Sequence, residues 1–92
     1  MDLKMIFGKN VKFYRFQKNY TQAKLAEKVG ISTNYLSEIE CGLHSVDFKV
    51  LDAIASNLDI EVFQLFIQPK DSSLPRRIDM NQKNNWFFFI IL

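Results

Sequence analysis

The chain has 92 residues, a formal net charge of +2 at pH 7 and a single cysteine, Cys41. This length allows one domain, or one small domain with an appendage, and one cysteine excludes an intramolecular disulfide and predicts no metal site. The longest apolar run, residues 86–92, is far shorter than the ~20 residues of a membrane-spanning helix, and the N-terminus lacks the apolar run of a secretory signal. We therefore expect a cytoplasmic protein with no membrane span.

Charge is distributed unevenly along the chain. Residues 1–20 hold five lysine and arginine side chains against one aspartate, whereas residues 47–66 hold one lysine against four carboxylates. The basic N-terminal segment can approach phosphate groups, and the acidic segment is expected to face away from them.

The first predicted element is a helix over residues 3–18. Phe7 and Val11 fall on one stripe at helical spacing, with lysine and arginine side chains elsewhere on the helix. Phe13 and Phe16 lie off this stripe, so they leave apolar surface that needs a partner.

The next two predicted helices occupy residues 21–42 and are joined by a tight turn. Thr21 and Ser32 are good N-terminal caps, because their hydroxyl oxygens can accept from backbone N–H groups of the first turn. Gly30 permits the left-handed conformation that ends the first of these helices, and Gly42 closes the second. The apolar positions expected to face the core are Leu25, Ala26, Val29, Ile31, Leu36 and Ile39.

A fourth helix is predicted to follow Asp47, its N-terminal cap, and a short fifth helix is predicted over Val62–Phe66. No alternating strand pattern is present before residue 67, so we predict an all-α domain of five helices. The apolar residues of the fourth helix are Phe48, Leu51, Ile54, Ala55 and Leu58.

The composition of the chain changes at Gln68, from regularly spaced apolar residues to a polar stretch. Residues 68–77 hold both prolines and are mostly polar, which is typical of a linker. We therefore divide the chain into a domain over residues 1–67 and a linker with an apolar tail over residues 68–92. Trp86–Leu92 has no charge of its own and has three interpretations: it pairs with a second copy of the chain, it folds back near Phe13 and Phe16, or it is a disordered end, a truncation artefact or a membrane-surface anchor.

The segment from Gly8 to about Phe66 resembles the Cro/C1-type helix-turn-helix family, which has the lambda-repressor-like fold. Each matching residue is common alone, but together, in register over about two thirds of the chain, they are specific for this fold. The matching residues are Gly8, Val11, Arg15, Thr21, Gln22, Leu25, Ala26, Gly30, Ile31, Ser32, Leu36, Ser37, Ile39, Glu40, Gly42, Leu51, Ala55, Leu58, Asp59 and Ile60.

The resemblance implies a role in DNA binding for particular residues. Gln22 would touch a phosphate at a helix N-terminus and brace a base-reading side chain. Asn34 could pair with an adenine edge, and Glu38 could accept from a cytosine amino group. Lys9 would contact the DNA backbone. His44, in the loop after the third helix, could touch a phosphate or be merely solvated. The full set of expected DNA-binding residues is Lys9, Gln22, Ser32, Thr33, Asn34, Tyr35, Ser37, Glu38 and His44.

The resemblance also implies a structural ion pair between Arg15 and Glu40 that bridges the first helix to the end of the third. In other respects the sequence departs from what DNA binding favours. Residues 32–40 contain two glutamates and no lysine or arginine, although phosphate contacts usually supply much of the affinity. Weak binding by one copy would make dimerisation important.

The sequence therefore predicts a sequence-specific regulator of transcription that binds double-stranded DNA as a homodimer, as a repressor rather than an activator. It reads the major groove with the third helix and uses no cofactor or small-molecule ligand. The alternative is a helix-turn-helix module that binds protein, such as an antitoxin or an accessory modulator of another regulator. An enzyme is not expected, because the single histidine has no nucleophile or carboxylate constellation around it.

Overall fold

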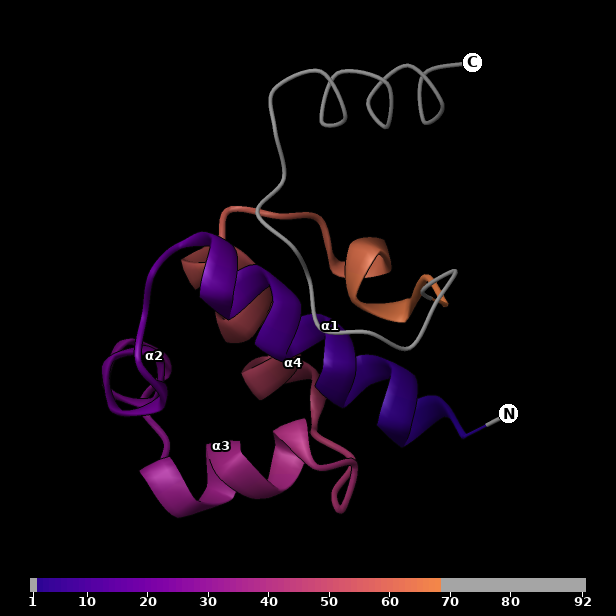
Figure 1. Ribbon diagram of the computed structural model, residues 1–92, viewed down its shortest axis with the longest axis horizontal. Coiled ribbons are helices and arrows are strands. Elements are labelled where there is room, and N and C mark those ends of the chain that lie inside the picture. The colour runs from indigo at the N-terminus through magenta and orange to yellow at the C-terminus, as the bar shows by residue number, and fades with distance from the viewer. Residues whose placement is uncertain (1, 69–92) are drawn as a thin grey trace.

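A computed structural model describes residues 2–68 (Figure 1). These residues form four α-helices and one 3-10 helix, and no strand occurs among them. In chain order the elements are α1 (Leu3–Gln17), α2 (Gln22–Val29), α3 (Thr33–Glu40), α4 (Phe48–Asn57) and η1 (Val62–Phe66). The all-α class is confirmed for residues 2–68. Apart from Gln68, the predicted linker and the apolar tail lie outside the described residues.

The predicted helix starts are confirmed by short side-chain hydrogen bonds. The Thr21 hydroxyl oxygen accepts from the Lys24 N–H at 3.0 Å, and the Ser32 hydroxyl oxygen accepts from the Tyr35 N–H at 3.0 Å. The Asp47 carboxylate accepts from the Val50 N–H at 2.9 Å. Each bond satisfies one of the N–H groups that a helix N-terminus leaves without an intrahelical acceptor.

Two glycines end the helices of the central pair. Gly30 has φ +86° and Gly42 has φ +81°, a left-handed conformation that side chains with a Cβ resist. Both turns therefore form where the sequence predicts them: the turn at Gly30 joins α2 to α3, and the turn at Gly42 leads the chain away from the end of α3.

The core lies where α1, α2, α3, α4 and η1 meet. Figure 1 shows α1 crossing in front of α4, with α3 below α1 and α2 seen almost end-on. The contacts join α1 to α3 and η1, and α2 to α3 and α4, so the α2–α3 pair is held from two sides. The largest fully buried side chains are Leu25, Leu36, Ile39, Ile54, Leu65 and Val11.

The fifth predicted helix is corrected by the structure, because Val62–Phe66 is a 3-10 helix and not an α-helix. Five residues suit the tighter 3-10 pattern, which is common in short connectors. The Gln64 side-chain oxygen accepts from the Glu61 N–H at 2.8 Å and closes the start of η1. Leu65 is fully buried, so η1 completes the core despite its short length.

Of the apolar residues of the fourth helix, Phe48 lies outside the core: its side chain is 83% exposed, whereas Leu51 and Ile54 on the same helix are buried. Phe48 is the first residue of α4, and side chains on a helix tilt toward its N-terminus. Its ring is therefore directed away from the core and into solvent.

Within residues 2–68, every helix falls short of the length and apolar character needed to cross a membrane. The same residues contain no group of three or more His, Cys, Asp or Glu side chains able to hold a metal ion.

Candidate nucleic-acid interface

The outer face of α3 displays polar side chains. Thr33, Asn34 and Glu38 are exposed, while Leu36 and Ile39 on the opposite side of the helix are fully buried. This division follows from the 3.6-residue period, which places residues 34 and 38 one above the other. Ser37, which is half-buried, lies beside these three residues. The four side chains expected to read bases therefore share one face of α3.

The N-terminus of α3 lies at one end of this face. Ser32 caps the helix through its hydroxyl, and the first N–H groups of α3 have no intrahelical acceptor. Such N–H groups, together with the helix dipole, favour an anion such as a phosphate. Tyr35 is half-buried and packs against the core, so it braces α3 as well as lying next to the exposed face.

A buried ion pair fixes α3 to α1. The Arg15 guanidinium donates to both Glu40 carboxylate oxygens, with Nε–Oε2 2.7 Å and Nη2–Oε1 2.9 Å. The side chains of Arg15 and Glu40 are only 7% and 2% exposed. A third donor, Nη1, binds the Tyr20 carbonyl oxygen at 2.9 Å, so the pair also holds the chain between α1 and α2.

Gln22, at the start of α2, joins this ion pair. Its side-chain nitrogen donates to Glu40 Oε1 at 3.0 Å. The carboxylate of Glu40 thus accepts from both α1 and α2, and three helices meet at one anion. In this geometry the Gln22 side chain is directed at Glu40, while its backbone N–H belongs to the first turn of α2, where a phosphate is favoured.

His44 and Glu38, both expected to contact DNA, are brought together by the loop after α3. His44 Nε2 lies 2.9 Å from Glu38 Oε1, and the His44 ring centroid is 5.5 Å from that of Tyr35. The two side chains are about half exposed. Spacing in the sequence does not predict this contact, because it depends on the left-handed turn at Gly42.

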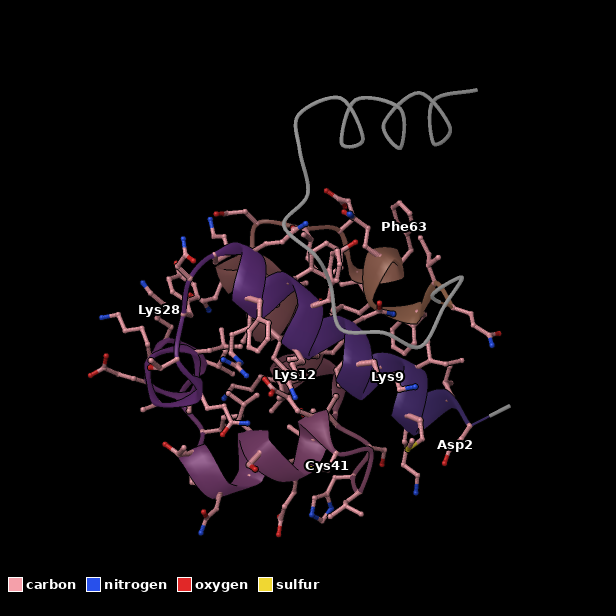
Figure 2. All side chains as sticks on the ribbon, viewed as in Figure 1. Asp2, Lys9, Lys12, Lys28, Cys41 and Phe63 are labelled. Carbon is pink, nitrogen blue, oxygen red and sulfur yellow. The ribbon has the colours of Figure 1, made fainter. Side chains whose placement is uncertain are left out.

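Because α3 has no lysine or arginine, basic side chains at this interface must come from other helices. Lys9 is exposed on α1, and Figure 2 shows Lys9 and Lys12 on α1 above Cys41, which follows α3, with Lys28 on the side of α2. Lys12 and Arg15 also lie against the ring of Phe16, at 5.8 Å and 4.8 Å from its centroid. These cations cover part of the apolar surface that the sequence leaves on α1.

Two residues that position α1 were missed as structural anchors. The buried Asn10 side chain donates to the carbonyl oxygens of Leu65 and Ile67, both at 2.9 Å, and so fastens η1 to α1. Gly8 faces α3 so closely that an added Cβ would lie 2.3 Å from the Ile39 carbonyl oxygen. In the sequence, Asn10 is only a polar residue between apolar positions of the first helix, and Gly8 is only one of the residues that match the family, so neither contact could be read from spacing.

Outside this interface, an exposed ion pair joins Lys18 to Asp59. The hydrogen bond from Lys18 and the charge of Lys18 lower the pKa of Asp59, and the same hydrogen bond, which the Asp59 carboxylate accepts, raises the pKa of Lys18. Burial raises the pKa of Tyr14, although a hydrogen bond with Gln64 acts in the opposite direction.

Comparison with known proteins agrees with this geometry. A helix-turn-helix family model matches residues 11–65. The transcriptional regulator SinR of Bacillus licheniformis is 30% identical over 80 residues, which cover 86% of this chain and 72% of that protein. The immunity repressor of Bacillus phage phi105 is 36% identical over 58 residues, covering 63% of this chain and 40% of that protein.

A solved structure shows the same arrangement. The N-terminal DNA-binding domain of SinR from Bacillus subtilis superposes with a TM-score of 0.65 and 35% identity, over 74% of this chain and 99% of that one. The family match covers more than half of this chain, and the fold and helix order agree with it. The chain therefore belongs to the Cro/C1-type helix-turn-helix family.

Proposed function

We propose that this protein is a sequence-specific DNA-binding regulator of transcription that acts as a repressor in the cytoplasm. The observation that supports this most strongly is the outer face of α3, where Thr33, Asn34 and Glu38 are exposed on a helix fixed from behind by the buried Arg15–Glu40 pair. A rigid helix with exposed amide, hydroxyl and carboxylate groups suits the donor and acceptor pattern of the major groove.

The names of the relatives support the same function. SinR and the phage protein are a regulator and a repressor by name, and the superposed SinR domain is a DNA-binding domain. A repressor is favoured over an activator because blocking a promoter requires no contact beyond DNA.

The proposal includes a homodimer. The outer face of α3 holds no lysine or arginine, so one copy has few charged phosphate contacts and gains little affinity from counterion release. Two copies would bind half-sites about 10 bp apart on an inverted repeat. Exposed apolar side chains around η1 offer a surface for pairing, since Phe63 and Ile67 are 48% and 40% exposed. The apolar tail of residues 86–92 is the other candidate for this contact.

Selection of bound sequences from random duplex DNA, using the whole chain, tests the proposal. We expect recovery of a short motif arranged as an inverted repeat. Recovery of no motif would favour the alternative, a helix-turn-helix module that binds another protein. Sedimentation of the chain with and without residues 80–92 tests the dimer: loss of the dimer on deletion would place the contact in the tail, and persistence would place it on the helical domain.

A further inference from the structure

The contact between Glu38 and His44 suggests a role for the histidine that differs from a phosphate contact. We infer that His44 is a positioning residue that holds the Glu38 carboxylate in place for reading a cytosine amino group. The inference rests on the proposed function, because it concerns how α3 would read bases.

The backbone after α3 brings His44 to Glu38. Gly42 adopts φ +81°, and its N–H binds the Ile39 carbonyl oxygen at 3.0 Å. The Leu43 N–H binds the Glu38 carbonyl oxygen, also at 3.0 Å. This pair of bonds is a Schellman motif, which turns the chain back over the last turn of a helix. The two backbone hydrogen bonds, donated by Gly42 and Leu43, therefore turn the chain back over the end of α3, and His44 follows directly.

The imidazole is held on a second side by Tyr35. The two ring centroids lie 5.5 Å apart with an interplanar angle of 60°, a tilted geometry favourable for aromatic rings. Tyr35 itself packs against the core. The imidazole thus lies between a core-anchored ring and the Glu38 carboxylate, so its own freedom is reduced before any ligand arrives.

The Glu38 carboxylate has two oxygens, and His44 contacts one. Nε2 of His44 lies 2.9 Å from Oε1, while the structure of residues 2–68 gives Oε2 no hydrogen-bond donor. A glutamate loses considerable rotamer freedom when it is immobilised, and a partner that restricts it in advance lowers that cost on binding. Oε2 is thereby available to accept from a cytosine N4 amino group.

A phosphate contact by the same His44 nitrogen would compete with this role. Nε2 cannot donate to Glu38 and to a phosphate at full strength together, so the two roles predict different behaviour. A positioning role acts at one base pair, whereas a phosphate contact acts on all sequences alike.

The test compares His44→Ala with the wild-type chain on the selected duplex and on duplexes changed at each base pair. If His44 positions Glu38, His44→Ala lowers the preference for one C·G pair by about two- to five-fold, the range expected of an exposed pair, and leaves affinity for unrelated DNA unchanged. His44→Gln restores the preference, because a glutamine amide nitrogen can also donate to Glu38. Ser45→Ala, an exposed neighbour on the same loop, is the matched control and should change neither quantity.

A double variant makes the test specific to Glu38. In a Glu38→Ala background, adding His44→Ala should cause no further loss of preference at that base pair. Equal weakening on every duplex with a shallower salt dependence would identify a phosphate contact and overturn the inference, as would unchanged preference in His44→Ala. If the wild-type chain selects no DNA sequence, the proposed function fails and this inference fails with it, which is a separate outcome from a selected motif that does not depend on His44.

Discussion

Replacing Arg15 with alanine should greatly destabilise the domain. The Arg15 guanidinium makes three hydrogen bonds, two to Glu40 and one to the Tyr20 carbonyl oxygen. The variant would leave the Glu40 carboxylate, 2% exposed, with only the Gln22 amide as a side-chain partner. Removing one partner of a buried ion pair costs about 3–5 kcal/mol, because the remaining charge is buried without compensation.

This cost is large relative to the total stability. A domain of this size has a free energy of unfolding of about 3–10 kcal/mol, so Arg15→Ala should lose between about a third and all of it. Urea unfolding followed by far-ultraviolet circular dichroism measures the change. The exposed Lys18–Asp59 pair is a matched control, because Lys18→Ala removes an ion pair that solvent already screens and should change stability much less.

A second control distinguishes the loss of the ion pair from the cost of leaving one charge buried alone. The double variant Arg15→Met and Glu40→Leu removes both charges, so it should be more stable than Arg15→Ala, since no charge is left buried alone. A loss of less than about 1 kcal/mol in the free energy of unfolding of Arg15→Ala, the scale of an exposed pair, would refute a stabilising role for the buried pair.

Two further variants test other contacts. Gly8→Ala should destabilise the domain by about 1–3 kcal/mol by overpacking, even though alanine favours a helix, because the new Cβ would lie 2.3 Å from the Ile39 carbonyl oxygen. The control Lys9→Ala, at an exposed position of the same helix, should leave urea unfolding nearly unchanged. A Gly8→Ala variant more stable than the wild type would contradict this packing. Burial raises the pKa of Tyr14 above its ordinary value of 10.0, so the neutral phenol favours the folded state: this contribution is complete below that value and is lost as the pH rises through the folded-state pKa. Thermal unfolding at increasing pH should therefore show a steeper alkaline loss of stability in the wild type than in Tyr14→Phe, and identical slopes would argue against the shift.

Local signals in the sequence predicted much of the fold. The caps at Thr21 and Ser32 and the left-handed turn at Gly30 each depend on residues within a few positions, so short-range chemistry determines them. The α2–α3 pair and the polar outer face of α3 follow from these signals and from helical periodicity.

Contacts between distant residues could not be predicted in the same way. Asn10 binds carbonyl oxygens more than fifty positions away in the chain, and no periodicity encodes that pairing. Phe48 has the right spacing for a core position, but spacing does not tell where the core ends. The Glu38–His44 contact needs the turn at Gly42 to be formed first.

The Arg15–Glu40 pair shows what a family resemblance adds to such signals. The residues are 25 positions apart, and neither charge pattern nor helical spacing alone relates them. The resemblance implied the pair, and the structure places the two groups 2.7 Å apart. Its contribution to stability is what Arg15→Ala measures.

The central claim is that the outer face of α3 reads base sequence. Asn34, exposed on that face, tests it most directly: binding of the wild type, Asn34→Ala and Lys9→Ala is measured by fluorescence anisotropy on the selected duplex and on duplexes changed at each base pair. We expect Asn34→Ala to lose about 1–3 kcal/mol of discrimination at one base pair, whereas Lys9→Ala should weaken binding to all duplexes alike. Uniform weakening by Asn34→Ala, or no change, would contradict base reading by α3.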